Sequence, residues 1–264
     1  MDTIQILGYI GALIVGLVLG LIGGGGSILT VPLLVYLLGY NPVIATAYSL
    51  FVVGASSMFG TYQKHKKGLV DFKTGLAFSF PSFVAVYLSR RYLVPGIPEV
   101  LFNIGDFSLT KDMGIMVFFA LIMIIASYSM IKNKKEDLHA TEESQPYYRT
   151  FIQGLVIGTI TGVIGAGGGF LYVPALVLWA NIPMKKAVGT SLIIVTINSL
   201  IGFMGDVQTL DIEWTFLLIF TGIAILGIFI GVFLSKFISG KKLKKSFGYF
   251  ILLMATYIIY RELK

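Results

Sequence analysis

Apolar residues occur along this chain in long runs separated by short polar stretches. A helix needs about 20 apolar residues to cross the hydrocarbon core of a bilayer. Two shorter runs, residues 28–38 and 170–180, would reach about 17 Å as helices, roughly half of that core. Eight runs have the full length: residues 4–22, 43–63, 69–89, 112–131, 150–168, 185–205, 214–236 and 245–261. The pattern predicts an all-α polytopic membrane protein with about eight full transmembrane helices and two short or broken ones.

Composition supports a chain that is embedded in lipid. Hydrophobic residues make up 56% of its 264 residues, charged residues make up 12%, and the mean hydropathy is +0.87. A soluble domain of this composition would leave large apolar patches in water. The first apolar run follows Asp2 rather than a basic stretch, so we interpret it as structure and not as a secretory signal. We expect a multi-pass protein of the inner (plasma) membrane.

The chain contains an internal repeat. Residues 20–60 align without a gap on residues 162–202, and 16 of these 41 pairs are identical, including glycine, proline and serine pairs. Shared hydrophobicity alone would not keep those residue types in register, so the chain holds two copies of one unit. The predicted first repeat is 1–131, with an extramembrane insertion at about 90–111; a cytoplasmic linker at 132–149 joins it to the second repeat, 150–264.

The distribution of basic residues predicts the topology. If each short run returns to the face from which its glycine-containing predecessor entered, 15 of the 20 basic residues fall on one face. That face is expected to be cytoplasmic, with both termini on the other side. Equivalent loops then lie on opposite faces and need not share a charge pattern; indeed residues 64–67 (Lys-His-Lys-Lys) correspond to residues 206–209 (Asp-Val-Gln-Thr). This predicts inverted-topology repeats, an architecture of transporters.

Both copies carry a glycine run that is unfavourable inside a helix, because each glycine costs about 1 kcal/mol relative to alanine. We expect the helix to break there and the short helices to restart at Pro32 and Pro174, since proline is favoured at a first helical position. The amides of residues 26–31 and 168–173 would then be unpaired. Together with two helix dipoles they would form an anion site without lysine or arginine.

Small polar side chains at equivalent positions could complete this site. Ser49 and Ser56 are seven residues apart and share one helix face, and Asn198, the equivalent of Ser56, is an amide that needs a partner in hydrocarbon. The predicted substrate-binding residues are Gly23, Gly24, Gly25, Gly26, Ser27, Tyr48, Ser49, Ser57, Gly165, Ala166, Gly167, Gly168, Gly169, Thr190, Ser191 and Asn198.

Several of these features have a second interpretation. Glycines upstream of the breaks fit close helix packing, and serine or threonine can bond to the backbone of its own helix. The equivalent carboxylates Asp71 and Glu213 are either gates or residues at helix N-termini. The basic run at 241–245 is expected to contact anionic lipid rather than nucleic acid. No lysine follows the glycines as in a phosphate-binding loop, and we expect no cofactor, metal or catalytic residue.

The motifs resemble the sulfite exporter TauE/SafE family of membrane proteins over nearly the whole chain. The resemblance is carried by residues 20–27 (GLIGGGGS), 31–32 (VP), 45–50 (ATAYSL), 162–169 (GVIGAGGG), 173–174 (VP) and 189–192 (GTSL). It implies export of a sulfur-containing anion such as sulfite, sulfoacetate or another organosulfonate. Tyr48, opposite the smaller Thr190 of the second copy, is expected to narrow one side of the site.

Together these features predict a carrier, not an enzyme, that exports a small anion by alternating access. An inside-negative potential contributes about 2.3 kcal/mol per 100 mV to the exit of a monoanion, so ATP is not required. With no carboxylate in the centre of a segment, proton coupling is expected to be weak or absent. Two alternatives are a membrane-embedded assembly subunit and an anion channel, and the oligomeric state is left open.

Overall fold

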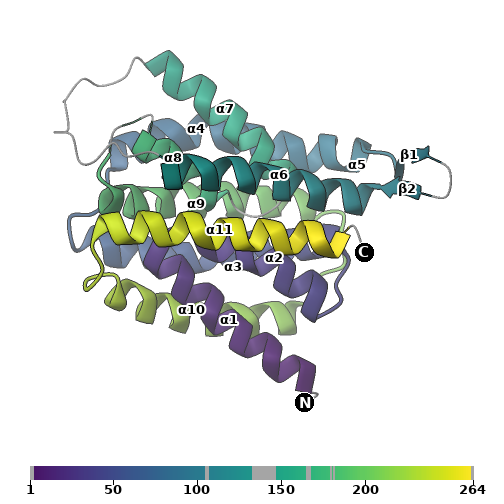
Figure 1. Ribbon diagram of the computed structural model, residues 1–264, viewed down its shortest axis with the longest axis horizontal. Helices are drawn as coiled ribbons and strands as arrows, with labels where there is room; N and C mark the ends of the chain where they lie inside the picture. The colour runs from purple at the N-terminus through teal and green to yellow at the C-terminus, as the bar shows by residue number, and fades with distance from the viewer. Residues whose placement is uncertain are drawn as a thin grey trace.

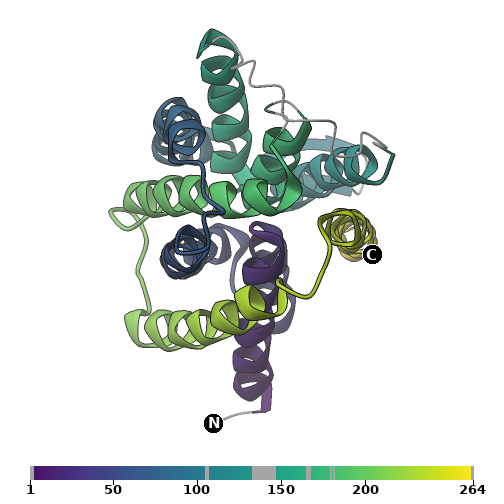
Figure 2. The ribbon, with the colours of Figure 1, turned by 90° about the vertical axis from the view of Figure 1, so that its left-hand side faces the viewer.

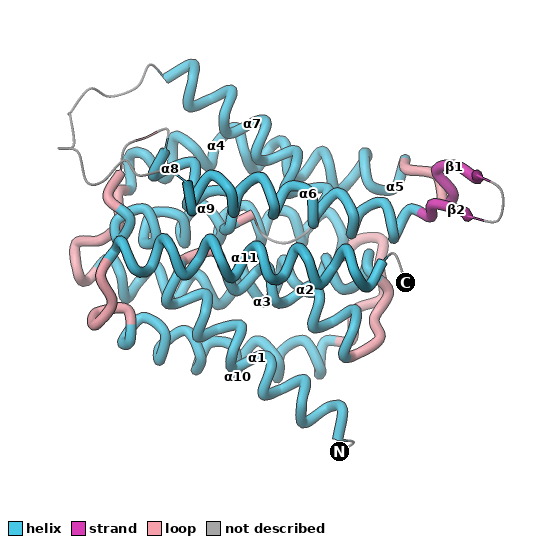
Figure 3. The backbone as a smooth tube through the Cα atoms, viewed as in Figure 1, coloured by secondary structure: helices cyan, strands magenta, loops and turns pink. Residues whose placement is uncertain are grey.

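The computed structural model describes residues 3–104, 107–132, 147–164, 168–178, 180 and 182–262. They form a bundle of helices whose long members run roughly along one axis, with α1 and α7 inclined to it (Figure 1, Figure 3). The first copy contributes α1 (Thr3–Ile22), α2 (Gly25–Pro32), η1 (Leu33–Leu37), α3 (Pro42–His65), α4 (Phe72–Leu88), η2 (Ser89–Leu93), α5 (Val94–Gly96), β1 (Val100–Ile104), β2 (Phe107–Thr110) and α6 (Lys111–Lys132). The second contributes α7 (Tyr147–Ile164), α8 (Gly169–Leu178), α9 (Met184–Asp206), α10 (Trp214–Leu234) and α11 (Gly240–Glu262).

The predicted multi-pass helical membrane protein is confirmed in its main features. Among the described residues, five helices are long and apolar enough to cross a membrane, namely α1, α3, α6, α9 and α10, and the expected eight full spans stay a prediction. The insertion at 90–111 departs from an all-helical chain, because β1 and β2 pair there as an antiparallel hairpin with Asn103 opposite Ser108. The predicted linker lies mostly outside the described residues.

The expected restart of the short helices at proline is wrong. Helix α2 begins at Gly25, so only Gly23 and Gly24 separate it from α1, and Pro32 is its last residue. In the second copy Pro174 lies inside α8. Unsatisfied backbone groups cost several kcal/mol in a lipid environment, which favours helix as soon as the chain has turned. Gly23 makes that turn with a φ of 79°, so the residues between the run and the proline are helical.

Helices α3 and α9 occupy the middle of the bundle and cross each other. Gly60 of α3 packs on Leu192 of α9, and the equivalent Gly202 of α9 packs on Leu50 of α3. Residue 60 of the first copy is equivalent to residue 202 of the second, and residue 50 is equivalent to residue 192, so the two contacts are equivalent in the repeat. The central crossing therefore has the same contacts from either helix.

The outer helices repeat this exchange between copies (Figure 2). A Cβ on Gly16 of α1 would overlap the carbonyl oxygen of Ala224 in α10, and a Cβ on the equivalent Gly158 of α7 would overlap that of Ser82 in α4. Gly20 and Gly162 make the same close approach one turn later. The packing interpretation of these four glycines is confirmed, and each copy lays its first helix on a helix of the other.

The bundle has two chemically different ends. At the hairpin end, formed by β1, β2 and residues 38–42 and 206–214, the amide of Glu213 donates to Tyr48 OH, 2.8 Å away. At the basic end, formed by residues 64–71, 182–186 and 235–242, Lys64 Nζ donates to Ser235 Oγ, 2.8 Å away. Helix α1 begins and helix α11 ends toward the hairpin end (Figure 1). The loops after α3 and after α9, which are equivalent in sequence, are thus at opposite ends.

We expect Gly16→Ala to lower the free energy of unfolding by about 1–3 kcal/mol, because the added methyl forces α1 away from α10. Gly222→Ala is the matched control, since Gly222 lies in α10 with nothing within 4 Å of an added Cβ. There the change should be neutral or stabilising by up to about 1 kcal/mol. Thermal unfolding midpoints of the purified variants in detergent test this. Equal midpoints would contradict the packing.

Candidate functional site

The two glycine runs meet inside the bundle. A Cβ on Gly24 would overlap the carbonyl group of Gly169, and a Cβ on Gly169 would overlap Cα of Gly24. Ser191 Oγ of α9 donates to the carbonyl of Gly23, 3.1 Å away. Glycine is therefore needed where backbone from one copy touches backbone from the other, and four of the predicted site residues are brought together.

Helices α3 and α9, which pack on each other, bury polar atoms that have no hydrogen-bond partner. Within the described residues every such side-chain atom belongs to one of these two helices: Ser49 Oγ, Ser56 Oγ, Ser57 Oγ, Thr61 Oγ1, Asn198 Oδ1 and Ser199 Oγ. Buried hydroxyls on other helices behave differently. Thr30, Ser79 and Thr221 each bond to the carbonyl four residues back in their own helix. Bonding within the helix therefore does not account for the four unpartnered hydroxyls of α3, which belong to Ser49, Ser56, Ser57 and Thr61.

Asn198 lies in a buried polar network. Its Nδ2 donates to Tyr172 OH at 2.7 Å and to Ser82 Oγ at 2.8 Å, and these two oxygens are 2.6 Å apart. Thr161 Oγ1 lies 3.3 Å from the same tyrosine oxygen. The network joins α4, α7, α8 and α9 and leaves Asn198 Oδ1 as an open acceptor.

The sequence analysis did not identify Tyr172, Ser82 or Thr161. Tyr172 carried a usable signal, because it is a polar residue within an apolar run, two residues before Pro174. A Cβ on Gly168 would overlap Thr161 and approach the Tyr172 ring, so this glycine, with a φ of 67°, lets the chain turn beside the network.

Tyr48 and Thr190 do not join the central group. Thr190 Oγ1 accepts from the amide of Asp71 at 2.9 Å, as Tyr48 OH accepts from that of Glu213. These two contacts are equivalent in the repeat and lie at opposite ends of the bundle. Asp71 caps α4 by accepting from the amide of Thr74, which confirms its position at a helix N-terminus.

Glu213 occupies the corresponding position before α10, and its carboxylate accepts from Tyr40 OH at 3.2 Å. Burial and the nearby Glu213 carboxylate raise the pKa of Tyr40, so this hydroxyl remains a donor at physiological pH. Both carboxylates therefore start helices and hold loops rather than line the centre.

The remaining predicted site residues belong to the glycine runs. Gly25, Gly26 and Ser27 form the first turn of α2, and Gly26 packs on the backbone of α1. The side chain of Ser27 is not among those described, and Gly165, Ala166 and Gly167 lie outside the described residues.

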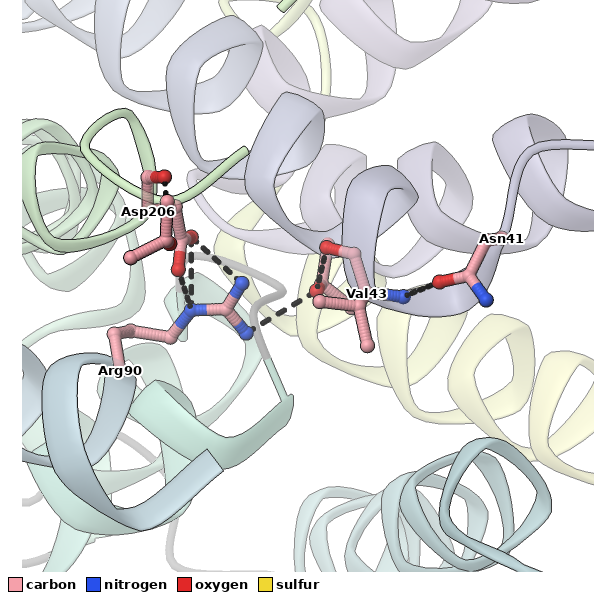
Figure 4. A network of polar contacts seen from close by, with 6 residues as sticks. Asn41, Val43, Arg90 and Asp206 are labelled. Carbon is pink, nitrogen blue, oxygen red and sulfur yellow. Dashed lines mark hydrogen bonds and ion pairs between the residues drawn. The ribbon is translucent and has the colours of Figure 1, made fainter. Parts of the chain in front are cut away.

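A buried ion pair closes the hairpin end (Figure 4). Arg90 Nε lies 2.9 Å from both carboxylate oxygens of Asp206, and Nη2 lies 2.6 Å from Oδ2. Nη1 donates to Thr46 Oγ1 at 3.1 Å. Arg90, at the start of the predicted insertion, is helical and 2% exposed. The pair ties η2 and the end of α9 to the start of α3.

A groove of about 570 Å³ lies between α4, η2 and α7. Its lining is mostly apolar and includes Leu88, Tyr92 and Leu155, and it touches none of the predicted site residues. The unpartnered polar atoms of α3 and α9 are themselves buried.

The sequence is similar to those of known membrane proteins. Residues 9–258 match the family model described as Sulfite exporter TauE/SafE. A probable membrane transporter protein of Xylella fastidiosa (strain 9a5c) is 31% identical over 256 residues, covering 94% of this chain and 92% of the relative. The probable membrane transporter protein YunE of Bacillus subtilis (strain 168) is 30% identical over 234 residues, covering 78% of this chain and 79% of the relative. No solved structure matches the chain.

We expect Asp206→Asn to destabilise the protein by about 3–5 kcal/mol, because it leaves the Arg90 guanidinium buried without a counter-charge. Lys186→Gln is the matched control. Its pair with Asp71 is 3.8 Å long and the lysine side chain is 43% exposed, so the loss should stay below about 1 kcal/mol.

The double variant Arg90→Met/Asp206→Leu should recover most of the stability, because it removes both buried charges. Unfolding midpoints of the four proteins in detergent measure these differences. A midpoint for Asp206→Asn equal to that of Lys186→Gln would show that the pair is not buried as described.

Proposed function

The chain belongs to the sulfite exporter TauE/SafE family of membrane proteins, and we propose that it exports a small sulfur-containing anion by alternating access. Membership of this family, and the relatives named as probable membrane transporter proteins, establish a membrane transporter. The substrate proposal follows from the family description and from the polar atoms at the centre of the bundle.

The two copies are proposed to be inverted relative to each other. The exchanged contacts support this: Gly60 with Leu192 and Gly202 with Leu50 at the central crossing, and Tyr48 and Thr190 with the loops of the opposite copy. An isologous interface has this property, because each contact occurs twice with the partners reversed. Two repeats related by a pseudo-two-fold axis in the membrane plane have their equivalent loops at opposite ends.

The observation that carries the proposed binding site is the set of six unpartnered polar atoms on α3 and α9. Polar side chains inside a membrane protein are costly and mark substrate pathways. Helices α3 and α9, which carry them, pack against α2 and α8, and the first amides of those short helices have no partner within the helix. Such donors, with the positive ends of two helix dipoles, suit a weakly held anion that must be released.

Alternating access is proposed to use the same contacts. In this conformation the Arg90–Asp206 pair closes the hairpin end. Movement of α3 against α9 would open first one end of the bundle and then the other, because the small residues at their crossing allow the two helices to slide. The basic end is proposed to face the cytoplasm of a plasma membrane, with both termini outside.

The transport proposal is tested with purified protein in liposomes and ³⁵S-sulfite. The wild type should show saturable transport and counterflow, which a channel would not show. Ser199→Ala should lower transport by roughly 10- to 100-fold, the effect of losing one hydrogen bond to a charged group, because the unpartnered hydroxyl of Ser199 can donate to an anion. Thr196→Val, on the same helix, removes a hydroxyl that bonds only to Leu192 of its own helix, and it should transport normally.

The absence of transport for sulfite, sulfoacetate and a short alkylsulfonate by folded wild-type protein would overturn the proposed substrate class. Equal rates for Ser199→Ala and Thr196→Val would instead remove Ser199 from the site while leaving transport intact.

The inverted arrangement is tested by labelling single cysteines, because the chain has no cysteine of its own. Lys66→Cys and Gln208→Cys place an exposed thiol in the two equivalent loops. A membrane-impermeant maleimide should label Gln208→Cys on intact cells and Lys66→Cys only after permeabilisation. Labelling of both from one face would exclude inverted halves.

A further inference from the structure

Lys64 is a buried cation without an anionic partner. It lies in the last turn of α3, is 2% exposed, and donates through Nζ to Ser235 Oγ at 2.8 Å. Within the described part of the chain the ion pairs are Arg90–Asp206 and Lys186–Asp71, and neither includes Lys64. A buried charge normally has a paired charge, because desolvation is costly.

The surroundings of Lys64 add positive charge. The positive charges of Lys67 and Lys185 repel the Lys64 ammonium. The negative potential nearby comes from the carboxyl end of α10, where the Val232 carbonyl accepts from Ser235 Oγ and from Lys67 Nζ. A helix end carries only about half a unit charge, so this end of the bundle keeps an unbalanced positive potential.

The repeat makes the contrast between the ends explicit. The equivalent of Lys64 in the second copy is Asp206, and that carboxylate is neutralised by Arg90. The same position in the two copies thus holds a closed ion pair at the hairpin end and an unmatched ammonium at the basic end.

A line of unpartnered hydroxyls leads from Lys64 into the bundle. Ser57, Thr61 and Lys64 follow at intervals of four and three residues, so they share one face of α3. Ser57 Oγ and Thr61 Oγ1 have no hydrogen-bond partner, and neither have Ser56 and Ser49 farther along. A lysine that only neutralised the end of α10 would leave these oxygens unexplained.

We propose that Lys64 captures the anion at the basic end and passes it along the hydroxyls of Thr61 and Ser57 toward the glycine runs. The ligand class is a small oxyanion such as a sulfite or sulfonate group, whose oxygens accept from an ammonium and from hydroxyls. This inference rests on the proposed transport function and adds the entry site to it.

The experiment measures the charge selectivity of the path, and it does not depend on the identity of the substrate. Thr61→Cys is placed in the cysteine-free chain, and inside-out vesicles are treated with an anionic or a cationic methanethiosulfonate of similar size. With Lys64 present the anionic reagent should react faster. Adding Lys64→Gln should lower the anionic-to-cationic rate ratio by about tenfold or more, because the charge is close and partly shielded from water.

Lys66→Gln is the matched control, because Lys66 is exposed and lies over the Tyr62 ring, 4.4 Å from its centroid. It should leave the ratio unchanged, and Lys64→Arg should preserve it. Since Lys64→Gln could fold poorly, ³⁵S-sulfite transport is also measured for Lys64→Cys before and after alkylation with 2-bromoethylamine, which releases bromide and forms a positively charged thioether that sulfite does not cleave. Restoring a positive charge on the folded protein should restore transport.

The outcomes separate this inference from the proposed function. A ratio that is equal in Lys64→Gln and Lys66→Gln, or a Thr61→Cys protein that reacts with neither reagent, overturns capture by Lys64 even if the wild type transports sulfite. If Lys64→Gln lowers the ratio but the wild type transports none of the sulfur anions, the entry site is supported and the proposed substrate class is overturned.

Discussion

The structure depends on one constraint: a helix that breaks within a membrane protein must satisfy or enclose its exposed backbone groups. The two breaks meet this constraint by lying against each other, Gly24 on Gly169, with Ser191 donating to the Gly23 carbonyl. Only glycine allows backbone from two segments to approach so closely, because any Cβ would occupy the space of the other chain. The breaks are thus a contact between the copies and not two separate sites.

This contact brings the central helices into position. Helix α2 packs on α3 and helix α8 packs on α9, and these two central helices bury polar side chains inside the bundle. In water those hydroxyls would be hydrated, whereas inside a bundle they require a ligand, another side chain or their own backbone. Their unpartnered oxygens are the strongest chemical indication of a binding path in the described residues.

The copies share their packing but not their polar groups. Glycine contacts repeat at the offset of 142 in α1 and α7, and in α3 and α9. By contrast, Tyr172 corresponds to Thr30, Asn198 to Ser56, and Asp206 to Lys64. A symmetric frame with asymmetric polar residues provides two ends with different electrostatics, one with a closed ion pair and one with unbalanced positive charge. The proposed entry of the anion at the basic end rests on this difference.

The sequence by itself determined the apolar helices and the repeat, because these follow from local hydrophobic length and residue register, whereas the inverted orientation of the two copies stays a prediction from the charge distribution. It also located the glycine breaks and the polar positions of α3 and α9. Tertiary structure decided what each polar atom contacts. Arg90 pairs with Asp206, Asn198 donates to Tyr172, and Tyr48 accepts from the amide of Glu213 in the loop before α10. Pro32 and Pro174 ended up inside or at the end of helices rather than at their start. The physical reason is range: a helix follows from its own residues, whereas a buried donor or acceptor is satisfied by whichever segment the fold places beside it.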